Sequence, residues 1–355
     1  MPLSLRRGTV TAIAENHEGL VRCEVDDEPC IAYPELTGPV AVGDEVIVNV
    51  QARELGLGSG GFDVVHANLT RGLGLPPPAG AHVMKLPYTP VQHAVRHVEE
   101  DEPLAEVLAG LPVVCCSLHS QLAPACAALA GLRVAYVQVA GGALPLPLSD
   151  TVRVLRERGL IGATVSAGAC FGGELESVTA AAALAWAAGR KFGAVVCAIG
   201  PGIVGTASRL GHGGLAAAEA ANTAAALQGS PVLAVRVSSG DPRERHQGVS
   251  HHTRAVVELC IGEVRIAWPA GLDAPDWLEH PIDVDTAGWR EACEDLPLEH
   301  MGRGPDDDPW FFASAFAAGK LARELASEWK NDDSARSSGS APGRRSTAMP
   351  TSRAK

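Results

Sequence analysis

The chain has 355 residues, a formal net charge of −12 and 46% hydrophobic residues, which is enough for one large or two modest domains with a real core. This composition excludes a disordered polymer, and nine cysteines without a Cys-x-x-Cys pair argue against a disulfide scaffold or structural zinc. The acidic balance with 4% aromatics argues against nucleic-acid partners, and the lack of a membrane-length apolar run or a secretory signal predicts a soluble, cytoplasmic protein.

Residues 1–75 are predicted to form a small β-barrel domain. Val21, Cys23 and Val25 alternate with two charged residues, a period of two that is typical of a strand with one buried face. Similar short runs, separated by turns, cover residues 8–13, 19–25, 30–33 and 40–49. A proline-rich connector at residues 75–80 follows, so we place the domain boundary near residue 75.

Residues 76–330 are predicted to form an α/β domain. Continuous apolar runs alternate with segments of helical length, as in a mostly parallel sheet with helices on both faces. The expected strands cover residues 112–116, 132–139, 161–165, 194–199, 231–237 and 264–268. The expected helices cover residues 121–129, 149–158, 175–190, 214–228 and 252–260.

The last part of the chain is predicted to be a helix and then a disordered basic tail. Asp308 followed by Pro309 is a typical helix start, because the carboxylate accepts free N–H groups and proline lacks one. Residues 331–355 carry five cations, two acids and six serines with almost no large apolar side chain, so we expect them to be disordered.

Polar loops follow five of the expected strands, at residues 117–120, 140–145, 166–177, 200–214 and 238–253. In a parallel sheet the carboxyl ends of the strands lie at one edge, where ligands usually bind. We therefore expect a single pocket to which these loops contribute.

Residues 200–214 contain six glycines and lead into an expected helix. Glycine lets a ligand approach backbone N–H groups, and a helix N-terminus favours negative charge, so this segment could bind a phosphate or carboxylate. The predicted ligand-binding residues, taken with the neighbouring strand ends, are Gly200, Gly202, Gly205, Thr206, His212, Gly141, Gly142 and His119. The alternative is that the glycines only serve tight turns and close helix–sheet packing.

Residues 236–254 gather four arginines and three histidines in an otherwise acidic chain. Arginine forks match anionic oxygens and histidine exchanges protons near neutral pH, so we predict an anionic substrate handled by acid–base catalysis. Arg243 and Arg245 are the expected anion ligands, and the candidate catalytic residues are His246, His251, His252, Asp241 and Glu174. A solvated charged loop is the alternative reading of the same run.

No metal site is assigned from the sequence. His251 and His252 are adjacent, so on a helix they should point about 100° apart and only one should face a given ion easily. Glu174 and Glu176 can equally well compensate a helix dipole, and Asp306 to Asp308 fit a cap and a solvated turn. Cys170 fits a buried thiol better than a nucleophile.

Four separated motifs resemble those of a bacterial family known as domain of unknown function 3866 (DUF3866). They are Gly141 to Pro145, Phe171 to Glu176, Gly200 to Thr206 and Arg243 to Thr253, and the likeness extends from Arg7 to about Leu321, through Val83 to Gln92 and Met301 to Gly304. The resemblance implies no known activity or cofactor. This sequence departs from the family pattern at Ala140, where an acidic residue is common, and at Ala207-Ser208, where a second Gly-Thr pair is common.

The sequence thus favours an enzyme that acts on a small anionic metabolite, phosphorylated compounds included, by transfer or hydrolysis. The cofactor is left open. Two alternatives remain: a non-catalytic regulator that senses a small anion, and an oligomeric scaffold in which alanine-rich helices such as residues 179–188 form contacts between copies of the chain.

Overall fold

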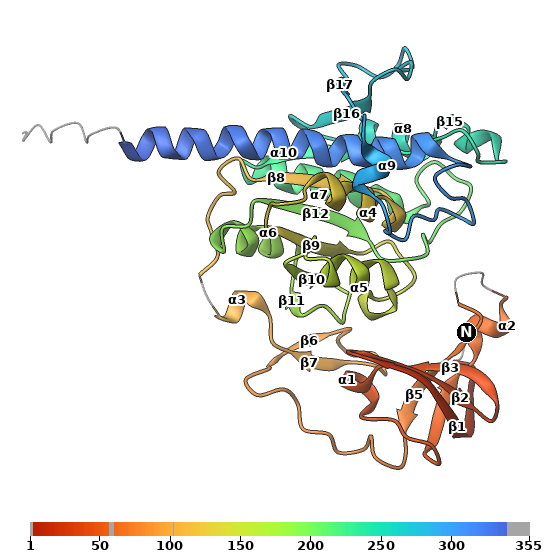
Figure 1. Cartoon of the computed structure of the whole chain (residues 1–355). Coiled ribbons are helices and arrows are strands. Elements are labelled where there is room, and N and C mark those ends of the chain that lie inside the picture. The colour runs from red at the N-terminus through yellow and green to blue at the C-terminus, as the bar shows by residue number, and fades with distance from the viewer. Residues whose placement is uncertain (1–2, 57–59, 102, 339–355) are drawn as a thin grey trace, which may run out of the picture.

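The computed structural model describes residues 3–56, 60–101 and 103–338 and consists of a small barrel beside a larger α/β unit (Figure 1). Both parts of the predicted fold class are confirmed: a closed barrel precedes an all-parallel sheet covered by helices. None of the helices within these residues combines the length and the apolar character needed to cross a membrane.

The barrel closes in the order β1-β2-β3-β5-β4. Its strands are β1 (Leu5–His17), β2 (Leu20–Val25), β3 (Glu28–Ala32), β4 (Glu45–Asn49) and β5 (Asp63–Asn68), with the short helices α1 (Pro34–Thr37) and α2 (Gln51–Glu54) between them. The alternation predicted for β2 places Val21, Cys23 and Val25 in the buried barrel core. The sequence analysis missed β5, which pairs with β3 and β4 and closes the barrel.

A connector joins the barrel to the α/β unit through a hairpin of β6 (Val83–Lys85) and β7 (His93–Val95), followed by α3 (Val98–Asp101). Lys85 anchors this hairpin to the sheet, because its buried ammonium group donates to Ser166 O at 2.8 Å, donates to Cys170 O, and forms an ion pair with Glu176. The connector is therefore packed on the α/β unit.

The sheet of the α/β unit has eight parallel strands in the order β11-β10-β9-β12-β8-β13-β16-β17. Its strands are β8 (Pro112–Cys116), β9 (Val134–Val139), β10 (Ala163–Ala167), β11 (Leu175–Ser177), β12 (Ala194–Ile199), β13 (Ser230–Ala234), β16 (Arg265–Pro269) and β17 (Ile282–Val284). The central strands are buried on both faces, which explains their continuous apolar sequences.

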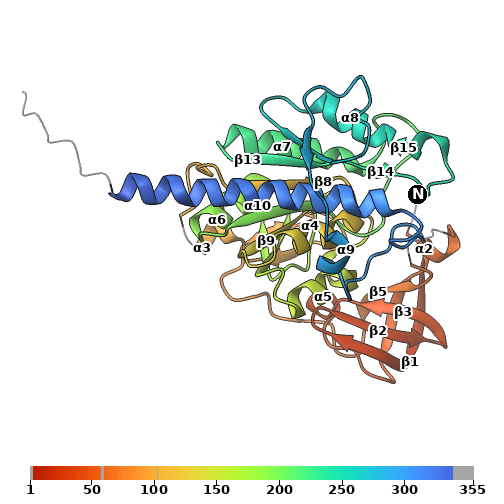
Figure 2. The same cartoon turned by 45° about the horizontal axis from the view of Figure 1, so that its top comes forward.

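Helices cover both faces of this sheet (Figures 1 and 2). One core cluster joins the sheet to α4 (Leu122–Ala128), α5 (Asp150–Glu157) and α10 (Pro309–Ser338), and the other joins it to α6 (Ala180–Gly189), α7 (Ala216–Ala226) and α8 (His251–Leu259). Successive residues of β8 show the division, since Val114 and Cys116 belong to the first cluster and Val113 and Cys115 to the second. The short elements are α9 (Trp289–Ala292), η1 (His119–Gln121), η2 (Leu146–Leu148), η3 (Gly213–Leu215), η4 (Glu244–His246) and a small ladder of β14 (Val237–Ser238) with β15 (Gly248–Val249).

The structure corrects three boundaries. The helix expected from residue 175 begins only at Ala180, after the Thr179 cap, because residues 175–177 form β11 and pair with β10. The strand expected to reach residue 237 ends at Ala234. Helix α10 continues to Ser338, into the expected tail, because a helix that has formed extends at the cost of only one residue per hydrogen bond; residues 339–355 lie outside the described residues.

Candidate functional site

The loops that follow β9 and β12 pack against each other at the carboxyl edge of the sheet. Ala143 N donates to Gly202 O at 2.7 Å, and Val204 N donates to Gly141 O at 3.1 Å. Gly142 and Ile203 form an isolated bridge. These contacts hold two of the predicted motifs, Gly141 to Pro145 and Gly200 to Thr206, together at this edge. The parallel topology accounts for this, because it places the loops after β9 and β12 side by side.

Close backbone packing accounts for several glycines of these loops. A Cβ atom on Gly213 would lie 1.9 Å from Gly141 O, and one on Gly142 would lie 2.2 Å from Gly200 O. Gly202 has a φ of +70°, which glycine adopts without strain. These glycines are explained by loop packing, so their presence is no evidence for an anion. Thr206 lies in the exposed hairpin beyond them, where its hydroxyl donates to Gly211 O at 3.2 Å.

Four imidazoles meet at the end of this glycine segment. His212 precedes η3, His246 ends η4, and His251 and His252 begin α8. The His212 and His252 rings stack with centroids 3.6 Å apart, and the His246 centroid lies 4.9 Å from those of both His251 and His252. We call these four residues the histidine cluster. The glycine segment and the two adjacent histidines thus lie on the same side of the molecule.

Both adjacent histidines face the cluster, which the sequence analysis did not expect. Their ring centroids are 4.4 Å apart. Ser250 is the extended N-cap residue of α8 and accepts from His252 N, so the two rings belong to the first turn. Side chains in a helix tilt toward its N-terminus, which lets both imidazoles reach the loop in front of α8. The expected separation of about 100° therefore did not keep the two rings apart.

The histidine cluster is held unprotonated. Burial and the nearby guanidinium of Arg236 lower the pKa of His246 to about 3, and burial and the neighbouring His212 lower the pKa of His252 to about 2. Burial also lowers the pKa values of His212 and His251. At neutral pH the cluster therefore presents nitrogen lone pairs.

A buried arginine–aspartate network lies beside the cluster. Arg236 is fully buried, and its Nη1 donates to His252 Nδ1 at 3.2 Å while its Nη2 lies 3.3 Å from Asp241 Oδ2. Asp241 also accepts from Arg243 and Arg303. Burial opposes ionisation of Asp241, but the hydrogen bonds from Arg243 outweigh it and lower its pKa. Asp241 therefore orders the network as a carboxylate.

The two predicted anion ligands differ in availability. The fork of Arg243 is turned onto Asp241, with Nη2 to Oδ2 at 2.7 Å. Arg245 is exposed, and within the described part of the chain no ion pair forms on it. Its positive charge helps to lower the pKa of His251. Arg245 is therefore the cation next to the cluster that remains available to a ligand.

Two predicted site residues make contacts elsewhere. His119 uses both ring nitrogens, Nδ1 with Ile199 O at 3.2 Å and Nε2 with Ser149 Oγ at 2.7 Å. Glu174 accepts from Thr164 N at 3.0 Å and pairs with Arg156, which ties the loop before β11 to β10 and α5. These contacts explain both residues structurally.

Sequence reasoning missed the second half of the network, which comes from residues 300–308. His300 lies over Phe311 with ring centroids 3.9 Å apart and reaches Arg236 Nη2 at 3.4 Å. Asp308 accepts from Ser239 N at 2.9 Å and from the Ser238 hydroxyl, so its carboxylate holds the loop after β13. The motif Met301 to Gly304 was the available signal for this segment.

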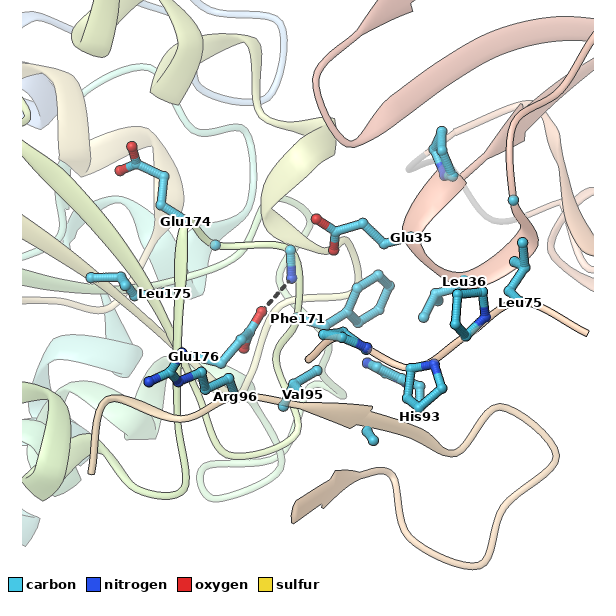
Figure 3. Close-up of a pocket in the computed structure, with 18 of the residues that line it drawn as sticks. Glu35, Leu36, Leu75, His93, Val95, Arg96, Phe171, Glu174, Leu175 and Glu176 are labelled. Carbon is cyan, nitrogen blue, oxygen red and sulfur yellow. Dashed lines mark hydrogen bonds between the residues drawn. The ribbon is translucent and has the colours of Figure 1, made fainter. Parts of the chain in front are cut away.

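A cavity of about 890 Å³ lies between the barrel and the α/β unit (Figure 3). Its walls come from α1, the proline-rich connector, β7 and the loop that precedes β11. Glu176 lies at the α/β side, where its carboxylate accepts from Gly172 N at 2.9 Å, the bond that Figure 3 shows as a dashed line. Burial raises the pKa of Glu176 to about 7, against the opposing charge of Lys85. Burial also raises the pKa of Cys170 to about 11, so this thiol is not activated.

Comparison with known proteins agrees with the motifs. The model of a family described as "Protein of unknown function (DUF3866)" matches residues 29–319. No match was found among curated proteins. The matched region covers most of the chain and includes the histidine cluster, the network beside it and the barrel from β3 onward, so the chain belongs to the DUF3866 family.

Proposed function

We propose that this protein is an enzyme that acts on a small anionic metabolite, phosphorylated compounds included, by group transfer or hydrolysis. The observation that carries the proposal is the convergence of four unprotonated imidazoles at the carboxyl edge of a parallel sheet. Perturbed titratable groups that meet at such an edge are typical of active sites. In this proposal His246, His251 and His252 form the reaction centre and carry its acid–base step.

The charges beside the histidine cluster favour an anionic substrate. Three guanidinium groups, from Arg236, Arg243 and Arg303, face two carboxylates, from Asp241 and Asp308, which leaves one positive charge in excess. Arg245 adds an exposed cation on the same loop. A fork of this kind binds carboxylate or phosphate oxygens with two parallel hydrogen bonds. We propose that the substrate anion contacts Arg245 and the exposed glycine segment around Thr206.

The test is a panel of phosphorylated and carboxylated metabolites, scored for turnover and for the shift in melting temperature of the full chain. We expect at least one compound to stabilise the wild-type protein and to be converted. Arg245→Ala should weaken its binding by about tenfold to a hundredfold, as expected for one charged hydrogen-bond partner, and His251→Ala should remove turnover while the stabilisation persists.

Two results would decide against the proposal. If no compound stabilises either the wild type or His251→Ala, the edge does not bind small anions. If a compound binds saturably and no product forms, the protein is a non-catalytic anion sensor.

A further inference from the structure

The nitrogen atoms of the histidine cluster are arranged like ligands of a metal ion. One ring nitrogen from each of His246, His251 and His252 can be chosen so that all three lie within 4.8 Å of one another. Nitrogens around a tetrahedral zinc ion, at about 2.1 Å from the metal, are roughly 3.4 Å apart. Small side-chain rotations that move each nitrogen by about an ångström would bring the three nitrogens to this spacing.

Buried nitrogens without a hydrogen bond point to the same conclusion. Nε2 of His251 is buried and has no hydrogen-bond partner among the described residues. Both ring nitrogens of His212, a residue only 6% exposed, also lack a hydrogen bond of good geometry among the described residues. An unpaired buried polar atom is costly. A bound ion that accepts the lone pair of His251 Nε2 would relieve this cost at that nitrogen.

The surroundings orient His246 as a ligand. Its Nδ1 lies 2.7 Å from Ser250 Oγ, and that hydroxyl oxygen also accepts from His252 N. When Nδ1–H donates to Ser250, Nε2 keeps its lone pair free. Histidine ligands of metals usually donate their second nitrogen in this way, which fixes the tautomer.

His252 imposes one condition on an ion. Arg236 donates to its Nδ1 at 3.2 Å, which places the proton of the neutral ring on Nε2. To bind an ion through Nε2, His252 must carry its proton on Nδ1 instead, and the ring must turn over about its Cβ–Cγ bond so that a carbon and not this N–H faces Arg236. The turned ring lies in the same plane as before, so it can still stack on His212.

We infer that His246, His251 and His252 hold a divalent transition-metal ion, and that zinc is the ion that suits them best. Three imidazoles without a carboxylate among them favour zinc and its neighbours over magnesium or calcium, which require oxygen ligands. His212 is a positioning residue that fixes the plane of His252.

Three protein ligands leave a fourth position open, as in catalytic rather than structural zinc sites. This part of the inference rests on the proposed function. With the ion bound, the three imidazoles would act as its ligands rather than as free bases, and a water molecule in the fourth position would supply the acid–base step in their place. The excess positive charge of the arginine–aspartate network opposes a cation by itself, so an anion in the fourth position should increase the affinity for the ion.

The experiment uses the full chain after treatment with a chelator. Zinc binding is measured by calorimetry, and cobalt binding by visible absorption, each with and without inorganic phosphate. We expect one ion per chain, cobalt absorption bands of a nitrogen-rich site of low coordination number, and tighter cobalt binding with phosphate. Loss of one ligand in His246→Gln or His251→Ala should weaken binding by at least about a hundredfold.

His280→Asn is the matched control, since His280 is exposed and belongs to a different loop of the same unit. It should bind the ion as the wild type does, and circular dichroism should show that all variants are folded. Failure to bind one ion per chain, or unchanged binding in both His246→Gln and His251→Ala, would overturn the inference. These measurements need no substrate, so an ion that binds without any turnover supports the metal site and contradicts only the proposed function.

Discussion

Replacing Lys85 with methionine removes the buried cation that holds the connector hairpin on the sheet. Lys85 is 3% exposed and serves three acceptors: the carbonyl oxygens of Ser166 and Cys170 and the carboxylate of Glu176. Methionine keeps most of the volume of the side chain and removes its charge and all three contacts. The variant therefore isolates the electrostatic part of this anchor.

The expected loss of stability depends on pH. Glu176 has a pKa of about 7 in the fold against an ordinary 4.5, and each unit of pKa corresponds to about 1.4 kcal/mol. Keeping it ionised above pH 7 therefore costs about 3 kcal/mol in the wild type. Without Lys85, Glu176 stays protonated in the folded state. At pH 8 this protonation lowers the free energy of unfolding by about 5 kcal/mol, which is about 1 to 2 kcal/mol more than the cost of the ionised Glu176 in the wild type. Two buried carbonyls that lose their donor add about 2 kcal/mol at any pH.

Urea unfolding of Lys85→Met at pH 8 should thus show a free energy of unfolding that is lower by about 3 to 4 kcal/mol, and at pH 5 by only about 2 kcal/mol. In a Glu176→Gln background there is no carboxylate to protonate, so the deficit of the double variant relative to the Glu176→Gln single variant should be the same at both pH values. A loss that is no larger at pH 8 than at pH 5, or below about 1 kcal/mol at both, would refute the assignment of Lys85 as the partner of an ionised Glu176.

Burial lowers the pKa of His119 to about 4, so its contribution to the free energy of unfolding is complete above pH 6.5 and is lost as the pH falls toward 4. Between pH 7 and pH 5 the wild type should therefore lose about 2 kcal/mol of stability in urea unfolding, and His119→Gln should not show this loss. Gly213→Ala places a Cβ atom 1.9 Å from a carbonyl oxygen of the facing loop and should lower the free energy of unfolding by about 2 kcal/mol or more, whereas Gly189→Ala, with its nearest atom at 3.8 Å, should be neutral or slightly stabilising in thermal melts. Asp308→Ala removes the carboxylate that accepts from the loop after β13 and should cost about 2 to 3 kcal/mol, and Asp308→Asn, which retains one carbonyl acceptor, should cost less in the same measurement.

Local sequence pattern was sufficient for most of the fold. The expected strands at residues 112–116 and 194–199 coincide with β8 and β12, because strands buried on both faces need continuous apolar sequences. The sequence pattern gave the wrong secondary structure where hydrogen bonding between strands decides it. Residues 175–177 read as part of a helix, yet hydrogen bonds from β10 make them a strand, and only the Thr179 cap marks the true start of α6.

The candidate site was predictable in its residues and less so in its geometry. Each histidine of the cluster was identified from its position after a strand, since parallel strands bring those loops to one edge. The electrostatic state was not predictable: the fork of Arg243 is occupied by Asp241, and Arg303 and Asp308 come from a segment about 60 residues further along the chain. Asp308 was expected to cap α10, but its carboxylate instead accepts from the loop after β13, because that loop lies in front of the helix.

The pairing of α10 with α4 has a consequence for folding. Phe316, Ala317 and Leu321 complete the core cluster that α4 and the sheet begin, yet they follow α4 by nearly two hundred residues. Contacts between such distant segments form only after a long loop has closed, which makes them slow, whereas all strands of the barrel come from the first 68 residues. During refolding the barrel can therefore become compact while the sheet face that α10 covers is still exposed to solvent. Until α10 docks, this apolar surface can bind other apolar segments.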